Sequence, residues 1–362
     1  MKFFVFGYWR KNAGDDLFLN ILCKRYPQWK FVISADNKDA DSFRQLDNLK
    51  VIHRGLIVRI ITHFSWKLFH MTFEDLYARF FFKNQIEIGG SIFQETSDWE
   101  KQLDRRLRRT RFTSNYLVIG SNFGPVKTDL FLSSYQKFLT QSKIVFRDNY
   151  SKDLFNNPDV KVAPDVVFSL KKYFNVERNN TGRKYVAISM IDLTGRVEDK
   201  NIVSQFEKKI AQTIHFYLQK KYGVVMMAFC EKEKDLESIQ RVCSMLNDID
   251  KIKIEIYVHH RIEKTLQVIN AASKIIATRF HAYIIGLTLG KEVLPIVYSE
   301  KTRHTLDDIQ QWKENPGIDI VAFLNMDIRH MDKQYVSLTP RINHLLQEEA
   351  SGQFQYLDKV NE

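Results

Sequence analysis

Residues 273–290 read SKIIATRFHAYIIGLTLG, two apolar runs that meet at an Arg-x-His. The first run, 275–278, is typical of a strand, and the second, 282–289, has the length of a helix and stops at a glycine. Arg279 and His281 therefore lie where a strand ends and a helix begins, at the carboxyl edge of an α/β sheet. Such edges bind ligands and helix N-termini attract anions, so the pattern predicts an anionic substrate at these two residues. The alternative is a structural arginine and a histidine satisfied within its own loop.

Strand-like and helix-like stretches alternate along the rest of the chain. The alternation is interrupted by a polar stretch at 171–184 and resumes to about residue 325. It indicates βα units around largely parallel sheets. We therefore predict an α/β protein with two Rossmann-like domains that face each other across a cleft. Residues 1–172 form the first domain, 180–325 the second and 326–362 a C-terminal helical segment and tail, with the polar stretch as the linker.

Composition limits the class of protein. With 362 residues, 44% of them hydrophobic and 27% charged, the chain has the size and composition of two folded domains. The net charge of +11 predicts anionic partners, which include nucleic acid, an anionic membrane surface and phosphorylated small molecules. Cys23, Cys230 and Cys243 are odd in number and lack zinc-type spacing, so we expect neither a disulfide framework nor a metal site.

The sequence favours a cytoplasmic location. Charged residues interrupt the apolar stretches at 56–69 and 282–298, so neither qualifies as a membrane span. Residues 2–7 read as a buried first strand and not as a signal peptide. We expect a cytoplasmic protein, with peripheral contact at the inner face of the membrane as a further option.

The loop after the first strand carries candidate ligand contacts. It contains Asn12, Gly14, Asp15 and Asp16 and opens the first helix. The two acids either cap that helix or contact a ligand. The loop lacks the G-x-G-x-x-G spacing, so a nicotinamide cofactor is not indicated.

Two glycine-rich loops follow later strands of the first half. One contains Gly89, Gly90 and Ser91, and the other contains Asn122 and Gly124. Glycines permit positive φ and close approach of the backbone, either for tight turns or for a ligand cradle. Two such loops on one sheet edge favour a wall of a ligand site.

Three further charged residues are candidates for the site. Arg147 follows a strand and either points into the cleft or pairs with Asp148 or another acid. Asp165 ends the last strand of the first half, where it caps a turn, binds a sugar hydroxyl or serves as a base. Lys301, in the basic stretch 298–304, either contacts donor or acceptor or belongs to a solvated loop.

A basic stretch at 101–111 and an aromatic stretch at 64–82 also lie in the first half. Together they either contact an anionic membrane surface that carries a lipid-linked sugar acceptor, or form a solvated helix face and a core-facing aromatic stripe.

Taken in order, these motifs resemble the polysaccharide pyruvyl transferase family over roughly residues 5–310. The segments that carry the resemblance are NAGDD at 12–16, GGSIFQ at 89–94, GSNFGP at 120–125, RD at 147–148, APD at 163–165 and TRFHA at 278–282. The chain departs from the family pattern at Ser91, where many members have a third glycine. This serine could donate a hydroxyl where the family has only backbone.

The resemblance implies a GT-B-like enzyme that transfers a pyruvyl group from phosphoenolpyruvate to two sugar hydroxyls. The product is a cyclic ketal in a cell-surface or exopolysaccharide precursor, and phosphate is released. Arg279 and His281 match the family's donor-binding and catalytic pair, with Phe280 between them, and Arg147 is a second match for a donor-binding arginine. We expect phosphoenolpyruvate on the second domain, a saccharide acceptor on the first, no other cofactor and no nucleic acid.

The chemistry of this reaction suits the same residues. Phosphoenolpyruvate carries a carboxylate and a phosphate, so its site needs at least two cations, and the planar guanidinium binds either group bidentately. Histidine exchanges protons near neutral pH, which makes His281 the best acid or base candidate. Two rival functions are a GT-B glycosyltransferase that uses a nucleotide sugar and a basic, non-catalytic nucleic-acid binder, although no recognition motif supports the binder.

Overall fold

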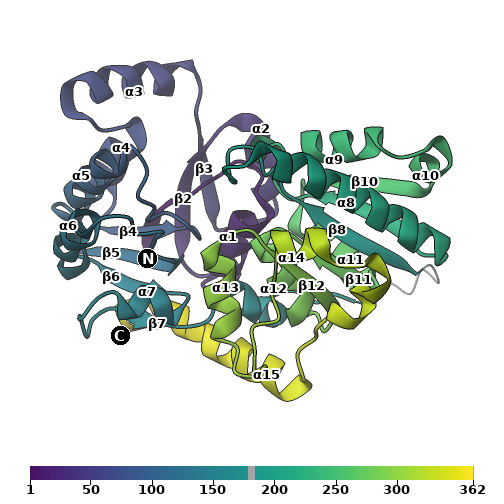
Figure 1. The fold of residues 1–362 in the computed structure, drawn as a ribbon. Coiled ribbons are helices and arrows are strands. Elements are labelled where there is room, and N and C mark those ends of the chain that lie inside the picture. The colour runs from purple at the N-terminus through teal and green to yellow at the C-terminus, as the bar shows by residue number, and fades with distance from the viewer. Residues whose placement is uncertain (178–183, 362) are drawn as a thin grey trace. The chain divides into compact units, whose positions relative to one another are not determined.

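The computed structural model describes residues 1–177 and 184–361; residues 178–183, part of the expected linker, lie outside the described residues. The chain forms two compact units (Figure 1). The first comprises Met1–Arg10, Asp15–Ser169 and Glu348–Glu362, and the second comprises Lys11–Gly14 and Leu170–Gln347. These bounds differ from the expected ones in three ways. The loop at Lys11–Gly14 belongs to the second unit, residues 170–172 belong to the second unit and not to the first, and the expected C-terminal segment 326–362 is divided between the units.

The first unit is built on a parallel sheet of seven strands in the order β3-β2-β1-β4-β5-β6-β7. The strands are β1 (Lys2–Phe6), β2 (Lys30–Ala35), β3 (Leu49–His53), β4 (Asn84–Ile88), β5 (Asn115–Ser121), β6 (Lys143–Phe146) and β7 (Lys161–Val162). The sheet order reverses between β1 and β4, which is where ligands bind in sheets of this kind. The loops that follow β1, β4, β5 and β6 carry most of the first-half candidates.

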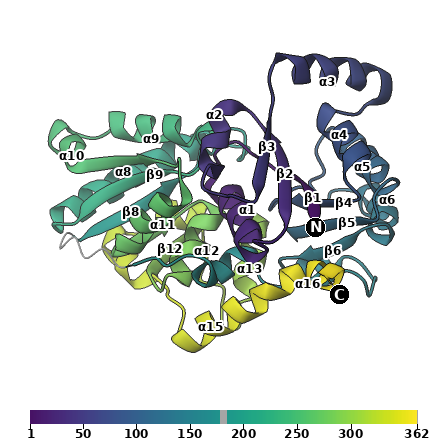
Figure 2. The ribbon, with the colours of Figure 1, turned by 180° about the vertical axis from the view of Figure 1, so that it is seen from behind.

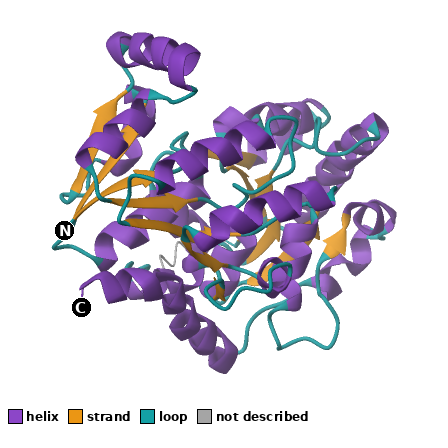
Figure 3. Ribbon diagram, turned by 90° about the vertical axis from the view of Figure 1, so that its left-hand side faces the viewer, coloured by secondary structure: helices purple, strands orange, loops and turns teal. Residues whose placement is uncertain are grey.

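Helices cover both faces of this sheet (Figures 2 and 3). The helices of the first unit are α1 (Ala13–Arg25), α2 (Asn37–Ala40), α3 (Leu56–Phe69), α4 (Phe73–Phe81), α5 (Trp99–Thr110), α6 (Asp129–Thr140), α7 (Asn149–Asp153) and α16 (Gln355–Asp358), of which α3 lies away from the sheet. Side chains alternate along β1, so Phe4 and Phe6 pack in one core with residues of α4, α5 and α6. Burial on both faces explains why these strands read as continuous apolar runs.

The second unit repeats the plan with a parallel sheet of six strands in the order β10-β9-β8-β11-β12-β13. The strands are β8 (Tyr185–Met190), β9 (Gly223–Ala228), β10 (Ile254–Val258), β11 (Lys274–Ala277), β12 (Glu292–Val297) and β13 (Ile318–Asp319). The helices are α8 (Lys200–Gln219), α9 (Asp235–Ser244), α10 (Asp248–Lys253), α11 (Ile262–Ala271), α12 (Phe280–Thr288), α13 (Glu300–Asp307), α14 (Ile320–Asn325) and α15 (Pro340–Glu349). In the described parts of the chain, no helix is long and apolar enough to cross a membrane.

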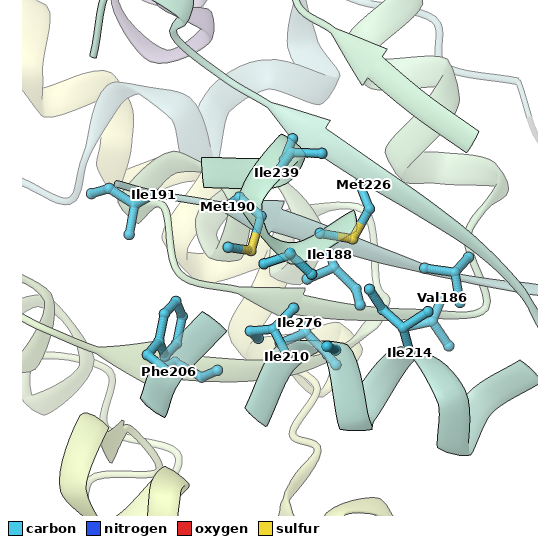
Figure 4. Close-up of a cluster of buried hydrophobic side chains, with 14 of the residues drawn as sticks. Val186, Ile188, Met190, Ile191, Phe206, Ile210, Ile214, Met226, Ile239 and Ile276 are labelled. Carbon is cyan, nitrogen blue, oxygen red and sulfur yellow. The ribbon is translucent and has the colours of Figure 1, made fainter. Parts of the chain in front are cut away.

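The core of the second unit fixes the strand that carries the Arg-x-His. Ile210 and Ile214 of α8 pack on Ile188 of β8 and Ile276 of β11 (Figure 4). Because successive side chains of a strand point to opposite faces, Ile275 of β11 lies on the other face of the sheet, where α12 packs. The strand is therefore held on both faces, and its carboxyl end is a rigid place for functional side chains.

A buried charge network lies inside the first unit. The basic stretch expected at 101–111 forms α5, and its Arg106 binds both carboxylate oxygens of Glu87 at 2.9 to 3.1 Å. Arg109 binds Asp75 at 2.7 Å, and the Tyr116 hydroxyl donates to Glu87 at 2.6 Å. Both arginines are at most 7% exposed, so neither belongs to the solvated or membrane-facing surface expected of this helix. Burial opposes ionisation of Glu87, but the charges of the two arginines outweigh it and lower its pKa to about 2.

Replacing Glu87 should therefore remove a pH-dependent part of the stability. Glu87→Gln leaves a buried guanidinium uncompensated, and we expect it to lower the free energy of unfolding by about 3 kcal/mol at neutral pH. The folded-state pKa lies below the ordinary value of 4.5, so the ionised Glu87 contributes fully above pH 4.5 and its contribution is lost as the pH falls toward 2. Urea unfolding in pH steps should show the two proteins converging across this window.

The exposed pair of Asp104 and Arg108, 2.8 Å apart on the same helix, provides the control. Asp104→Asn should change the free energy of unfolding by no more than about 0.5 kcal/mol at any pH. A Glu87→Gln deficit that stays constant down to pH 2 would contradict the assignment.

Candidate functional site

The Arg-x-His segment lies at the junction of β11 and α12, as the apolar pattern predicts. The junction is tied to the neighbouring strand β8 by one serine. The amides of Thr278 and Arg279 donate to the Ser189 hydroxyl at 3.1 and 3.3 Å. The Thr278 hydroxyl donates to the Ser189 carbonyl at 2.6 Å. The backbone that carries Arg279 is therefore fixed to the end of β8.

Arg279 is buried and held by two carboxylates. Its Nε donates to Asp235 Oδ2 at 2.9 Å, its Nη2 donates to Asp235 Oδ1, and its Nη1 donates to Glu233 Oε2 at 2.6 Å. Asp235 also accepts the amides of Phe229 and Cys230 at 3.0 and 2.9 Å. Burial would lower the pKa of Arg279, but the two carboxylates outweigh it and raise that pKa. Arg279 is thus a permanent cation whose orientation is set by Asp235.

Glu233 lies at the centre of the basic groups of this unit. Its Oε2 accepts from Arg279 and from Arg196 Nη2, each at 2.6 Å, and its Oε1 accepts from Asn12 Nδ2 at 3.3 Å. Burial would raise the pKa of Glu233, but Arg279, Arg196 and Lys301 lower it. A single carboxylate therefore occupies the position where two arginines and an amide converge.

The potential around this cluster is positive. Burial would raise the pKa of the Tyr298 hydroxyl, yet the charges of Lys301, Arg279 and Arg196 lower it below its ordinary value. Lys301, on α13, has its Nζ 5.9 Å from the centre of the Tyr298 ring. Three cations thus act on the hydroxyl of one partly buried tyrosine, and such a place attracts an anionic ligand.

The first loop of the chain joins this cluster. The backbone of Asn12 forms an antiparallel bridge with Cys230, and the Asn12 side chain accepts the Gly14 amide at 3.0 Å. A β-carbon at Gly14 would lie 1.8 Å from His281 Nδ1, so only glycine allows the imidazole to reach the backbone here. The ring of Phe280 packs edge-on to His281 with centroids 5.0 Å apart. His281 is therefore placed by the loop backbone and by Phe280, which is itself buried.

A second polar cluster lies in the first unit. Arg147, with a side chain 1% exposed, donates to Asp165 Oδ2 at 3.1 Å and to Asn122 Oδ1 at 2.7 Å. Ser91 Oγ donates to the same oxygen of Asn122 at 3.1 Å. A β-carbon at Gly90 would lie 2.8 Å from Arg147 Nη1, so the glycine loop lies directly on the guanidinium. The two glycine-rich loops, Arg147 and Asp165 are thereby brought together at one edge of the sheet.

The remaining predicted residues have local roles that the structure shows. Asp165 accepts the Val167 amide at 2.9 Å, which is the turn-capping role considered for it. The acid that caps α7 is Asp148, which accepts the Ser151 amide at 2.8 Å, so the ion pair of Arg147 is with Asp165. Asp16 is buried in the first turn of α1.

Gly89 and Gly124 adopt φ of +152° and +106°, and the Gly124 amide donates to Phe93 O at 2.8 Å. These two glycines therefore shape the loops through their backbone.

Four residues of the cluster were not predicted from the sequence: Glu233, Asp235, Arg196 and Tyr298. Asp235 and Glu233 belong to the stretch EKEKD at 231–235, whose alternating charges are typical of a solvated turn. The position of this stretch could have marked it as a candidate, because it lies just after β9 at the carboxyl edge of the sheet. No pattern in the sequence indicates that Asp235 pairs with Arg279, which lies 44 residues later in the chain.

Three solved structures with a similar fold span nearly the whole chain. MnaA of S. aureus, solved with UDP, is 13% identical with a TM-score of 0.59 and covers 100% of this chain and 98% of its own. UDP-GlcNAc 2-epimerase of Neisseria meningitidis is 12% identical with a TM-score of 0.58, covering 99% and 100%. Anabaena Alr3699/HepE, solved with UDP and glucose, is 13% identical with a TM-score of 0.54, covering 99% of each. These likenesses concern the fold alone and confirm the predicted α/β class of two Rossmann-like domains of the GT-B type.

Sequence comparison identifies the family. None of the curated proteins compared with the chain matches it. Residues 12–300, however, match the family described as Polysaccharide pyruvyl transferase. The match extends from Asn12 of the first loop through the Arg-x-His junction and the cluster around Glu233, and it covers most of the chain. The chain therefore belongs to the polysaccharide pyruvyl transferase family.

Proposed function

We propose that the protein transfers the pyruvyl group of phosphoenolpyruvate to two hydroxyls of a sugar in a cell-surface or exopolysaccharide precursor. The observation that carries this proposal is the placement of His281, against the Gly14 backbone and at the start of α12, in the same unit as the cationic cluster. Membership of the family supports it. Phosphoenolpyruvate serves as the donor, and the reaction as proposed uses no resident cofactor.

The donor is assigned to the cationic cluster of the second unit. Arg196, Arg279 and Lys301 face two carboxylates, so the cluster retains an excess of positive charge for a ligand that carries both a carboxylate and a phosphate. Because Asp235 fixes Arg279, we propose that the donor displaces Glu233, whose carboxylate occupies the position of an anionic group between Arg279 and Arg196. The N-terminus of α12 adds a favourable dipole for the same anion.

The proposed reaction balances without an external reagent. Two C–O bonds form between the sugar and C2 of phosphoenolpyruvate, and the bond from C2 to the phosphate oxygen breaks. Of the two hydroxyl protons, one ends on the methylene carbon, which becomes a methyl group, and the other ends on the released phosphate. We assign to His281 the transfer of a proton to the methylene carbon and its later recovery from a hydroxyl. Positive charge at the donor site stabilises the departing phosphate.

The acceptor is assigned to the first unit. The hydroxyl of Ser91, the amide of Asn122 and the carboxylate of Asp165 are the kinds of group that bind sugar hydroxyls, and they lie beside two glycine loops. Arg147 is buried and neutralised by Asp165, which favours a positioning role for it. We therefore propose Arg196, in place of Arg147, as the second donor-binding arginine. We also propose a saccharide on a lipid carrier as the acceptor.

Release of phosphate from phosphoenolpyruvate should depend on an added glycoside. We expect phosphate only when a suitable acceptor is present, with a ketal-linked pyruvate found in the product by mass spectrometry. Failure across a broad acceptor panel would count heavily against the transferase. Consumption of a nucleotide sugar without phosphoenolpyruvate would instead support the GT-B glycosyltransferase.

His281 and Arg196 should affect different kinetic constants. His281→Ala should abolish turnover and leave donor binding partly intact, because the proton carrier is lost and the cations remain. Arg196→Ala should raise the KM for phosphoenolpyruvate by about tenfold with a smaller effect on kcat. Arg196 is preferred to Arg279 for this test because Arg279→Ala would leave the buried carboxylate of Asp235 without its arginine partner.

Arg303→Ala, on α13 beside Lys301, removes a surface cation and should leave both constants unchanged. Full activity of the His281 variant would refute its assigned role.

Gly14→Ala should disable the enzyme through His281. The new methyl group would overlap the imidazole and force the ring or the loop to move, so we expect kcat to fall by about 100-fold or more. The NMR signals of the His281 ring should shift in the same variant. Gly55→Ala is the matched control, because a β-carbon at Gly55 meets nothing within 4 Å. Wild-type turnover in Gly14→Ala would show that this contact does not position the catalytic group.

A further inference from the structure

Helix α3 of the first unit exposes an apolar face. Ile57, Ile60, Ile61, Phe64 and Leu68 are between 39% and 74% exposed. Their spacing of three and four residues places them on one side of the helix. Figures 1 and 3 show α3 at the periphery of this unit, away from the strands. The stretch 64–82, considered above as a core-facing stripe, therefore begins on a helix whose apolar side chains face outward.

The side of α3 that contacts the protein carries Val58, Thr62 and Ser65, the three residues of this helix that are not exposed. Thr62 Oγ1 accepts the Phe73 amide at 3.2 Å. Ser65 is buried, and its Oγ donates to the Met71 carbonyl at 2.7 Å. A surface helix of a globular protein normally shows the reverse arrangement, with apolar side chains inward. Since the fold does not use the apolar face of α3, that face is available to a partner.

Positive charge borders the apolar face. Residues 56–70 contain no acidic residue, while Arg59, His63 and Lys67 follow one another at intervals of four along one flank. The same flank lines a groove of about 700 Å³. The charged groups that line it are Arg10, Arg54, Arg59, Lys67 and Arg105, against Asp36 and Glu74. The groove therefore has a net positive charge, because its five cations outnumber its two carboxylates even where Arg10, Arg54 and Arg59 form ion pairs with them.

We infer that α3 docks this protein on an anionic membrane surface. Its apolar face enters the boundary of the acyl chains, and the basic flank and groove lie at the level of the phosphate headgroups. An interfacial helix has this combination of an apolar face containing Phe and Leu, a basic edge and a half-exposed Trp, here Trp66 at 37%. The net charge of +11 acts in the same direction.

A second copy of the chain is a poorer partner for this face. Pairing α3 with α3 would bring two basic flanks together, because the helix has no acid to compensate them. An anionic bilayer satisfies both the apolar face and the basic flank. Docking on it goes beyond the proposed reaction and does not depend on it.

Vesicle binding by the full chain tests this inference. We expect sedimentation with vesicles of phosphatidylcholine mixed with phosphatidylglycerol, weak binding to phosphatidylcholine alone, and weakening with added salt. The double variant Phe64→Ser/Leu68→Ser should lower the partition coefficient by about tenfold or more, because two exposed apolar side chains no longer enter the lipid. Lys67→Gln should weaken binding to the anionic vesicles by about fivefold and leave binding to phosphatidylcholine unchanged.

The matched control is Ile249→Ser/Ile252→Ser on α10, where the two side chains are 66% and 85% exposed. It should bind vesicles like the wild type. Thermal unfolding and phosphate release without vesicles should match the wild type for all these variants, since α3 holds no residue assigned to the reaction.

Equal vesicle binding by the Phe64/Leu68 variant and the wild type would overturn the inference, as would no binding to either vesicle. Sedimentation velocity without lipid provides the other decisive measurement. A dimer that the Phe64/Leu68 variant abolishes, together with no vesicle binding, would identify a second copy as the partner.

Discussion

The bidentate ion pair of Arg279 with Asp235 is the interaction on which the geometry of the second unit depends. It joins the end of β11 to the start of α9, and Asp235 also binds two backbone amides at the end of β9. A buried guanidinium needs compensation by a carboxylate, and a buried carboxylate needs donors, so each partner is costly to remove. Asp235 accepts hydrogen bonds from two nitrogens of Arg279, which leaves the third nitrogen for Glu233. Glu233 also accepts hydrogen bonds from Arg196 and Asn12. The cationic cluster and its central carboxylate both follow from this one pairing.

The second constraint is the path of the first loop. Residues Lys11–Gly14 pack with the second unit although the strand before them and most of the helix after them belong to the first. The bridge to Cys230 brings Asn12 to Glu233, 221 residues later in the chain. Gly14 then contacts His281, and no other residue would fit. A motif at the start of the sequence and one near residue 280 thus become one site, because the backbone crosses between units at this point.

Helices α5 and α3 show opposite departures from what their composition indicates. The arginine-rich α5 turns Arg106 and Arg109 inward, where Glu87 and Asp75 neutralise them. The apolar α3 turns Phe64 and its neighbours outward, because Thr62 and Ser65 form the side that contacts the protein. In both cases specific polar partners on neighbouring elements decide which side of the helix is buried. Mean hydropathy along the segment contains no information about those partners.

The α/β class, the strand-to-helix junctions and the positions of the loops that carry candidate residues were all predictable from the amino-acid sequence. They were predictable because these features depend on local periodicity, on glycine and on the parallel rule that places strand ends at one edge. Arg279 and His281 were predicted at such a junction, and they lie there.

Three pairings follow from the folded structure and not from any local pattern. Arg279 is held by Asp235, Glu233 lies among the cations, and Arg147 is buried against Asp165. Those pairings join residues from separate βα units. Any of the many acids in the chain satisfies the same chemistry, so the choice among them is made by packing.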